Sequence, residues 1–212
     1  MLPQVSWRPP EISRLPSWRD AKVVSIDVEC RDEDLMELGP GVRRDPSKNY
    51  VCGVAFAVED GEAHYLPIRH EGGDNLPIEH VRQYLRDQFA VFRGVVTGCA
   101  LEYDLDWLWN SPALGIEMPR VSEYDDVQVN DVLINELHDH YSLNALCERW
   151  DLPPKDETAL NQAANAYRVH PKRDIWRLPG RMVADYGIGD VRRPLVIRRR
   201  QLEVIRRDGL EP

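Results

Sequence analysis

The stretch KVVSIDVE, residues 22–29, alternates apolar and polar residues and ends in two acids. A period of two is typical of a β-strand, because successive side chains of a strand point to opposite faces of the sheet. The apolar residues at positions 24, 26 and 28 therefore share the face that we expect to be buried. Asp27 and Glu29 share the other face, so their carboxylates point the same way.

Around this strand, the chain divides into strand-like and helix-like segments. Residues 31–49 combine acidic, Gly- and Pro-containing and basic runs, which is typical of a long loop. Asp60-Gly61 between two apolar runs indicates a hairpin. We predict further strands at 51–58, 63–68, 94–98 and 124–127, and helices at 77–92, 101–109, 129–137, 142–150, 156–167 and 179–207. This order predicts an α/β fold, a mixed five-stranded sheet flanked by helices, as in a ribonuclease H-like fold.

The composition is that of a single globular domain. The chain has 212 residues, 42% of them hydrophobic and 30% charged, which is enough to bury a sizeable core. Residues 1–21 are Pro-rich and predict an irregular arm on a body formed by residues 22–212. The four cysteines show no CxxC pair and no apolar run approaches the roughly 20 residues of a membrane span. We therefore expect free thiols and a cytoplasmic location.

The charge is unevenly distributed along the chain. The formal net charge is −9, yet residues 168–200 hold ten Arg or Lys against three Asp. A basic segment on an acidic body is compatible with binding of a polyanion, although solvated helix faces produce similar runs.

A second acidic segment, CALEYDLDWL at residues 99–108, follows a predicted buried strand and enters a helix. Helical spacing places Asp104 beside the leucine stripe of this helix and turns Asp106 about 200° away from it. Asp104 is therefore the candidate ligand and Asp106 a solvated acid. A single acid in a first helical turn is also explained by its favourable interaction with the helix dipole, so this segment alone does not identify a metal ligand.

A third segment, YGIGD at residues 186–190, lies on the predicted long helix. Tyr186 and Asp190 are four residues apart and so project from one helix face. Each glycine between them costs about 1 kcal/mol relative to Ala in a helix, and the missing side chains permit close approach of the backbone to a sheet or substrate. Simple helix packing is the alternative explanation.

Four carboxylates of this kind suit the hydrolysis of a phosphodiester. Two divalent ions about 4 Å apart can activate water, neutralise the phosphoryl oxygens and stabilise the leaving alkoxide. Mg²⁺ and Mn²⁺ prefer oxygen ligands, so several carboxylates must converge. The candidate ligands of two such ions are Asp27, Glu29, Asp104 and Asp190, with Tyr186 beside them.

In this order and spacing, Asp27-x-Glu29, Tyr103-Asp104 and Tyr186-x-x-x-Asp190 resemble the three motifs of the DEDD exonucleases, in their tyrosine-bearing branch. The segments between them also resemble the proofreading exonuclease domain of phage-like family A DNA polymerases. These segments are GVAFAV at 53–58, YSLNAL at 141–146 and DVRRPL at 190–195. The resemblance covers roughly residues 20–207. Cys99-Ala100 departs from it, since the family usually has His-Asn there.

The resemblance implies a role for each motif residue. Asp27, Glu29 and Asp190 would hold one metal ion, and Asp27 with Asp104 nearby would hold the other. Tyr186 would orient the attacking water or help to deprotonate it, and positioning is favoured because a phenol is a poor base at neutral pH. The implied activity is stepwise removal of nucleoside monophosphates from the 3′ end of single-stranded DNA. A DNA polymerase acting in cis or in trans is the implied partner, in a bacterial or phage-infected cell.

Weaker signals are kept as hypotheses. Trp176, with Arg173 and Arg177 in the basic loop, is a candidate for stacking on single-stranded DNA. Asp126 ends the predicted fifth strand and is a candidate to face the site. The pair His138-x-His140 lacks a third metal ligand nearby and is better explained as a polar turn.

Two alternatives to a DNA exonuclease stay open. An RNA 3′-exonuclease of the ribonuclease D type would use the same carboxylates, because the preference for a 2′-hydroxyl depends on pocket shape. A catalytically silent nucleic-acid-binding module is the other, although its uncompensated acids would repel one another and phosphate.

Overall fold

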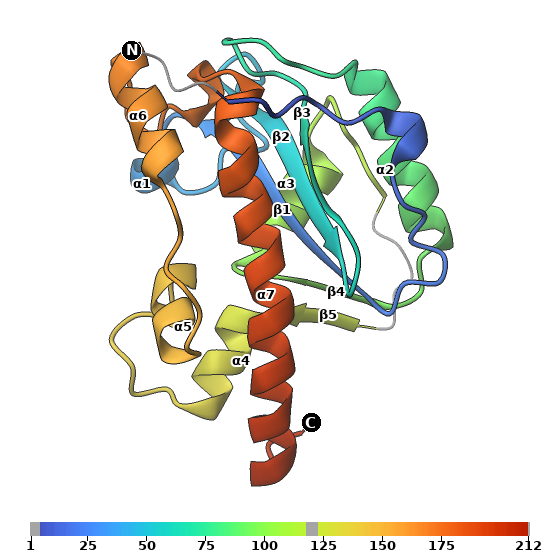
Figure 1. Ribbon diagram of the computed structural model, residues 1–212, viewed down its shortest axis with the longest axis vertical. Coiled ribbons are helices and arrows are strands. Elements are labelled where there is room, and N and C mark those ends of the chain that lie inside the picture. Colours follow the sequence, from blue (N-terminus) through green and yellow to red (C-terminus); the bar gives the residue numbers. More distant parts are fainter. Residues whose placement is uncertain (1–4, 118–122, 212) are drawn as a thin grey trace.

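The computed structural model describes residues 5–117 and 123–211 and centres on one sheet (Figure 1). The strand order is β3-β2-β1-β4-β5, with β2 antiparallel to β1 and β3, and with β4 parallel to both β1 and β5. The strands are β1 (Val23–Asp32), β2 (Asn49–Val58), β3 (Ala63–Pro67), β4 (Val95–Gly98) and β5 (Glu123–Asp126). The predicted mixed five-stranded sheet is therefore confirmed.

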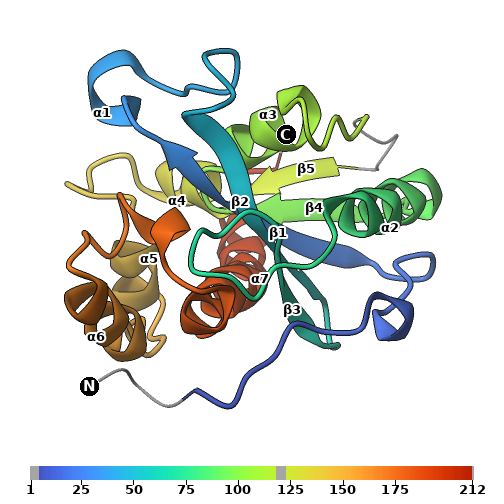
Figure 2. The same cartoon turned by 90° about the horizontal axis from the view of Figure 1, so that it is seen from above.

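Helices cover both faces of the sheet (Figure 2). The longer ones are α2 (Ile78–Val91), α3 (Leu101–Asn110), α4 (Val127–Ile134), α5 (Leu143–Arg149), α6 (Thr158–Tyr167) and α7 (Gly180–Asp208). The short ones are α1 (Leu35–Leu38), η1 (Ile12–Arg14) and η2 (Ile175–Arg177). Apolar residues of α2 and α3 share a core with one face of the sheet, and those of α6 and α7 share a second core with the other face.

The central strand β1 contributes to both cores in the predicted alternation. Val24, Ile26 and Val28 are buried in the core beneath α2 and α3. Asp27 and Glu29 consequently face the side of the sheet that α7 covers. The strand does not end at Glu29 as predicted, since it continues to Asp32 after a register shift between residues 29 and 30. Such a bulge re-aims the side chains around it, and bulges are common next to active sites.

The Pro-rich arm is anchored on the body by Trp18. The indole of Trp18 is fully buried and lies 5.1 Å, centroid to centroid, from both Phe56 and Phe89. Its backbone N–H donates to Gln88 Oε1 at 2.9 Å. The arm therefore completes the core beneath α2. Among the described residues, no helix is both long and apolar enough to cross a membrane.

Candidate active site

Three of the four predicted carboxylates converge between β1 and α7. Asp27, Glu29 and Asp190 each offer one ligand atom, and these atoms all lie within 4.8 Å of one another. The approach of α7 to the sheet depends on Gly187, because a Cβ there would lie 2.9 Å from Cδ2 of Tyr65 on β3. The glycine thus performs the role expected from the sequence.

Asp104 lies next to this group but outside it. Its side chain is buried, and its Oδ1 accepts a hydrogen bond from the backbone N–H of Val28 at 3.1 Å. The carboxylate is thereby attached to β1 between the two acids of the first motif. Asp106 points elsewhere and is paired with Arg43 at 2.8 Å, so it is an ion-paired acid rather than a free one.

The start of α3, which carries Asp104, is fixed by Asp126. Ala100 precedes the helix in a left-handed conformation (φ 61°) and has no side-chain oxygen to cap it. Asp126 supplies the cap from β5, accepting from the N–H of Leu101 at 2.7 Å and from that of Ala100 at 3.3 Å. The same carboxylate accepts from Gln128 N–H at 2.7 Å and so caps α4 as well. Asp126 therefore supports the second motif where Cys99-Ala100 departs from the family pattern.

The carboxylates shift one another's proton affinity. Burial, followed by the charge of Asp190, raises the pKa of Asp27 to about 8. Burial and then Asp27 raise the pKa of Glu29 well above its usual value, and the same two causes raise the pKa of Asp104. Acids so close together cannot all ionise without a nearby cation. The arrangement is typical of a functional site rather than of structural acids.

Lys155 supplies one such cation, and sequence reasoning missed it. Its Nζ lies 2.7 Å from Asp190 Oδ2, and the two side chains are 10% and 8% exposed. The ammonium also lies 4.8 Å from the ring centroid of Tyr186. Lys155 stands in the segment between α5 and α6, after Pro153-Pro154, and no sequence motif connects it with the acids.

The carboxylates fit a divalent cation. Glu29 Oε1 and Asp190 Oδ1 are buried and have no hydrogen-bond partner. Buried acceptors without partners are rare unless an ion or water completes them. The donor set is entirely carboxylate oxygen, which Mg²⁺ and Mn²⁺ prefer. The residues present therefore match the expected cofactor.

The chain is similar in sequence to parts of two phage polymerases. It is 52% identical over 195 residues to a DNA-directed DNA polymerase of Pseudomonas phage M6, covering 92% of this chain and 29% of that protein. DpoZ, a DNA polymerase of Vibrio phage phiVC8, is 26% identical over 207 residues, covering 90% and 29%. The chain thus spans less than a third of the length of these relatives. No family model matches it.

Solved structures of nucleases share the fold. Brucella melitensis NrnC bound to pGG has a TM-score of 0.58 at 17% identity, over 92% of this chain and 80% of that one. The EXO domain of Aedes aegypti Nibbler has a TM-score of 0.51 at 14% identity, over 92% and 84%. A family B DNA polymerase of Pyrobaculum calidifontis has a TM-score of 0.51 at 18% identity, over 86% and 24%.

The described part of the chain therefore has the fold that these nuclease structures share. The three acidic segments identified in the sequence lie on β1, α3 and α7. A cavity of about 880 Å³ opens beside Glu29, between the segment that follows it and the basic loop before α7. Two basic residues and three acids are among those that line this cavity: Lys172, Arg173, Glu33, Asp34 and Glu37.

The aromatic residue of the basic loop is half-buried. The guanidinium of Arg31 lies 4.0 Å from the ring centroid of Trp176, and Tyr50 packs edge-on against the same ring. One face of the indole is therefore covered within the exonuclease fold. Arg173 and Arg177 are exposed, and the guanidinium of Arg177 lies 5.9 Å from the ring centroid of Trp176.

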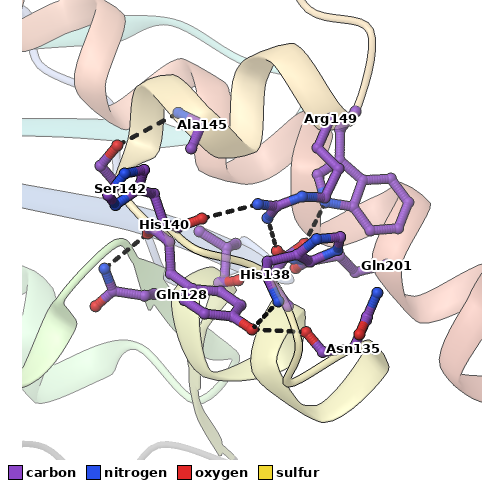
Figure 3. A network of polar contacts seen from close by, with 12 residues as sticks. Gln128, Asn135, His138, His140, Ser142, Ala145, Arg149 and Gln201 are labelled. Carbon is purple, nitrogen blue, oxygen red and sulfur yellow. Dashed lines mark hydrogen bonds and ion pairs between the residues drawn. The ribbon is translucent and has the colours of Figure 1, made fainter.

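The two histidines of the 138–140 segment belong to a polar turn, as expected. Tyr141 Oη accepts from His138 N–H at 3.1 Å, and Arg149 donates to the carbonyl of His140 at 2.8 Å (Figure 3). Ser142 caps α5 by accepting from Ala145 N–H. Among the residues the structure describes, the metal-competent group contains neither histidine.

Proposed function

We propose that this chain is a metal-dependent 3′-to-5′ exonuclease that releases nucleoside monophosphates from single-stranded DNA. The observation that carries the proposal is the group Asp27, Glu29 and Asp190, with ligand atoms within 4.8 Å and two buried oxygens without partners. The phage polymerase relatives favour DNA as the substrate. They also favour proofreading or end-trimming beside a polymerase, in cis or in trans, in an infected bacterial cell.

The four acids divide between two Mg²⁺ or Mn²⁺ ions in this proposal. Asp27, Glu29 and Asp190 hold one ion, and Asp27 with Asp104 holds the other. When bound, the ions supply an activated water and neutralise charge on the phosphoryl oxygens. A solved structure of NrnC with bound Mg²⁺ supports magnesium as the cofactor of such a fold.

Tyr186 is assigned to positioning the attacking water. Burial, and after it the charge of Glu29, raises the pKa of its phenol, so the hydroxyl keeps its proton at neutral pH. A protonated phenol can donate and accept hydrogen bonds but is a poor general base. Orientation of water is therefore the role that this environment supports.

The cavity beside Glu29 is assigned to the 3′-terminal nucleotide. It adjoins the carboxylate group, so a nucleotide within it would present its phosphate to the acids. Arg173 on the cavity wall is placed to neutralise backbone phosphate, and Arg177 extends the same basic loop. Trp176, with one face covered by Arg31, is a candidate for edge contact with a base.

Digestion of a 5′-labelled single strand tests the proposal. We expect a ladder of products shortened from the 3′ end in Mg²⁺, with EDTA or a 3′-phosphate abolishing it. Asp27→Asn should remove the activity and Glu62→Gln, an exposed acid remote from the motifs, should not. Equal activity of wild type and Asp27→Asn would refute the assignment.

Parallel substrates distinguish the alternatives. Faster digestion of an RNA strand of equal sequence would favour the ribonuclease D type. That alternative is supported by NrnC, whose solved structure contains pGG. Absence of Mn²⁺ binding by calorimetry would favour the silent nucleic-acid-binding module.

A further inference from the structure

Lys155 occupies a position that the proposed exonuclease mechanism does not explain. Its Nζ contacts Asp190 Oδ2 at 2.7 Å, although Asp190 is a carboxylate expected to hold a divalent ion. The ammonium is nearly as buried as its partner, with 10% of the side chain exposed. A long flexible side chain is ordered here at an entropic cost, which indicates a strong electrostatic demand.

The electrostatic attraction that orders the Lys155 ammonium comes from the whole acidic group and not from Asp190 alone. Lys155 acts to lower the pKa of Asp27, Glu29 and Asp190, and it is the first cause that opposes burial for Asp190. By comparison, Lys172 acts to lower the pKa of Glu29, and Arg193 acts to lower that of Asp190. The ammonium is therefore the principal internal counter-ion of the group.

We propose that Lys155 is a positioning residue that keeps the carboxylates assembled before metal arrives and releases Asp190 when a divalent cation binds. The inference rests on the proposed metal site. A cation held by oxygens within 4.8 Å of one another necessarily approaches the ammonium, and the two positive charges compete for one carboxylate. Lys155 thus sets the metal affinity of the site.

Other acids near Lys155 could accept its ammonium group if it left Asp190. A cavity of about 410 Å³ adjoins Lys155 along α7, and Tyr186 and Asp190 are among the residues that line it. Asp156 and Asp185 line this cavity, and both are exposed acids. The preceding backbone is held in place, because Arg193 donates to the carbonyl of Pro154 at 3.3 Å. The ammonium can therefore turn within this cavity from Asp190 toward Asp156 or Asp185 while its backbone stays fixed.

Calorimetry with Mn²⁺ on Lys155→Met tests the competition. Removing the charge at nearly constant length should tighten Mn²⁺ binding by about tenfold or more, equivalent to about 1.4 kcal/mol. Lys155→Arg keeps the charge and should bind within a few-fold of wild type. Lys48→Met, the matched control, makes the same charge change at an exposed residue and should leave the affinity unaltered. Equal or weaker Mn²⁺ binding by Lys155→Met would overturn the proposal.

Lysine side-chain NMR on the wild-type protein gives a test that needs no stable variant. The chain contains four lysines, Lys22, Lys48, Lys155 and Lys172, so a selectively labelled sample has few signals. Mg²⁺ should shift the Lys155 signal in step with binding and leave those of Lys22 and Lys48 in place. An unmoved Lys155 signal at Mg²⁺ saturation overturns the inference and leaves the proposed function intact. Failure of every sample to bind metal overturns both.

Discussion

Buried acids lie at two sites along α7, and the two sites differ in how many carboxylate oxygens have a hydrogen-bond or ion-pair partner. Asp131 is 1% exposed, and its Oδ1 accepts from Trp150 Nε1 at 2.6 Å and from Gln201 Nε2 at 3.2 Å. Its other oxygen pairs with Arg149 (Figure 3). At the candidate active site, by contrast, Glu29 and Asp190 each retain a buried oxygen without a partner.

The difference separates a structural acid from a candidate functional one. Asp131 joins α4, α5 and α7 through partners that the chain itself provides, so its charge is balanced in the folded protein. The carboxylates on β1 and α7 are balanced only in part by Lys155. A partly satisfied polar group destabilises the fold unless something outside the chain completes it. The carboxylate oxygens without partners therefore indicate a binding site for a cation.

Exonuclease activity should separate Asp27 from Asp131 more strongly than any other measurement. Asp27→Asn should lower the single-turnover rate on single-stranded DNA by at least about a thousandfold, because a metal ligand is lost. Asp131→Asn should leave the rate of the folded fraction within about threefold of wild type, because Asp131 lies outside the candidate active site. A comparable loss in both variants would contradict the division into structural and functional acids.

The free energy of unfolding should fall more in Asp131→Asn than in Asp27→Asn, the reverse of their order in activity loss. Asp131→Asn leaves the Arg149 charge unpaired beside buried groups, which costs about 3–5 kcal/mol when a buried pair is broken. Asp27→Asn replaces a carboxyl that keeps its proton near neutral pH with a neutral amide, so it should not lower the stability of the metal-free protein. Urea denaturation in EDTA measures both, with the exposed Asp139→Asn as the matched control. Destabilisation by Asp27→Asn similar to that by Asp131→Asn would indicate that both acids are structural.

The two glycines of α7 should differ by a smaller amount. A Cβ on Gly187 meets the Tyr65 ring at 2.9 Å, and overpacking of this kind costs about 1–3 kcal/mol. A Cβ on Gly189 meets only the flexible end of Arg193, so Gly189→Ala should be neutral or gain up to about 1 kcal/mol of helix propensity. Thermal denaturation compares the two variants. Equal stabilities would mean that α7 can move away from the sheet freely.

The smallest expected effect is the pH dependence of the metal-free protein. The folded state keeps a proton on Asp27 up to a pKa of about 8, whereas an unfolded Asp loses it near about 3.9. The folded state binds more protons across this window, so stability falls as pH rises through it. We expect a loss of at least about 1 kcal/mol between pH 5 and pH 8.5, after allowance for screening.

Urea denaturation in EDTA at both pH values measures this loss. Saturating Mg²⁺ should remove or reverse it, because the ion binds ionised carboxylates. Asp27→Asn should flatten the metal-free profile. A rise in metal-free stability with pH would show that the cluster is already neutralised inside the chain.

Local patterns in the sequence were enough to predict the five-stranded sheet and to single out the three acidic segments. Alternation at residues 22–29 decided which face of β1 carries Asp27 and Glu29, because strand geometry leaves two choices only. Helical angle separated Asp104 from Asp106, and the i, i+4 spacing paired Tyr186 with Asp190. These are local regularities, so they need no knowledge of distant contacts.

The residues that surround the acids come from distant parts of the chain and could not be predicted from local patterns. Lys155 is 35 residues from Asp190 and reaches it because α5 and α6 lie along α7 (Figures 1 and 2). Asp126 caps α3 from a neighbouring strand, 25 residues away from Leu101. Neither contact follows a local period, since each depends on how separate elements pack. Asp131 and Asp190 are likewise both helical aspartates in sequence, and their different partners become visible only in the folded chain.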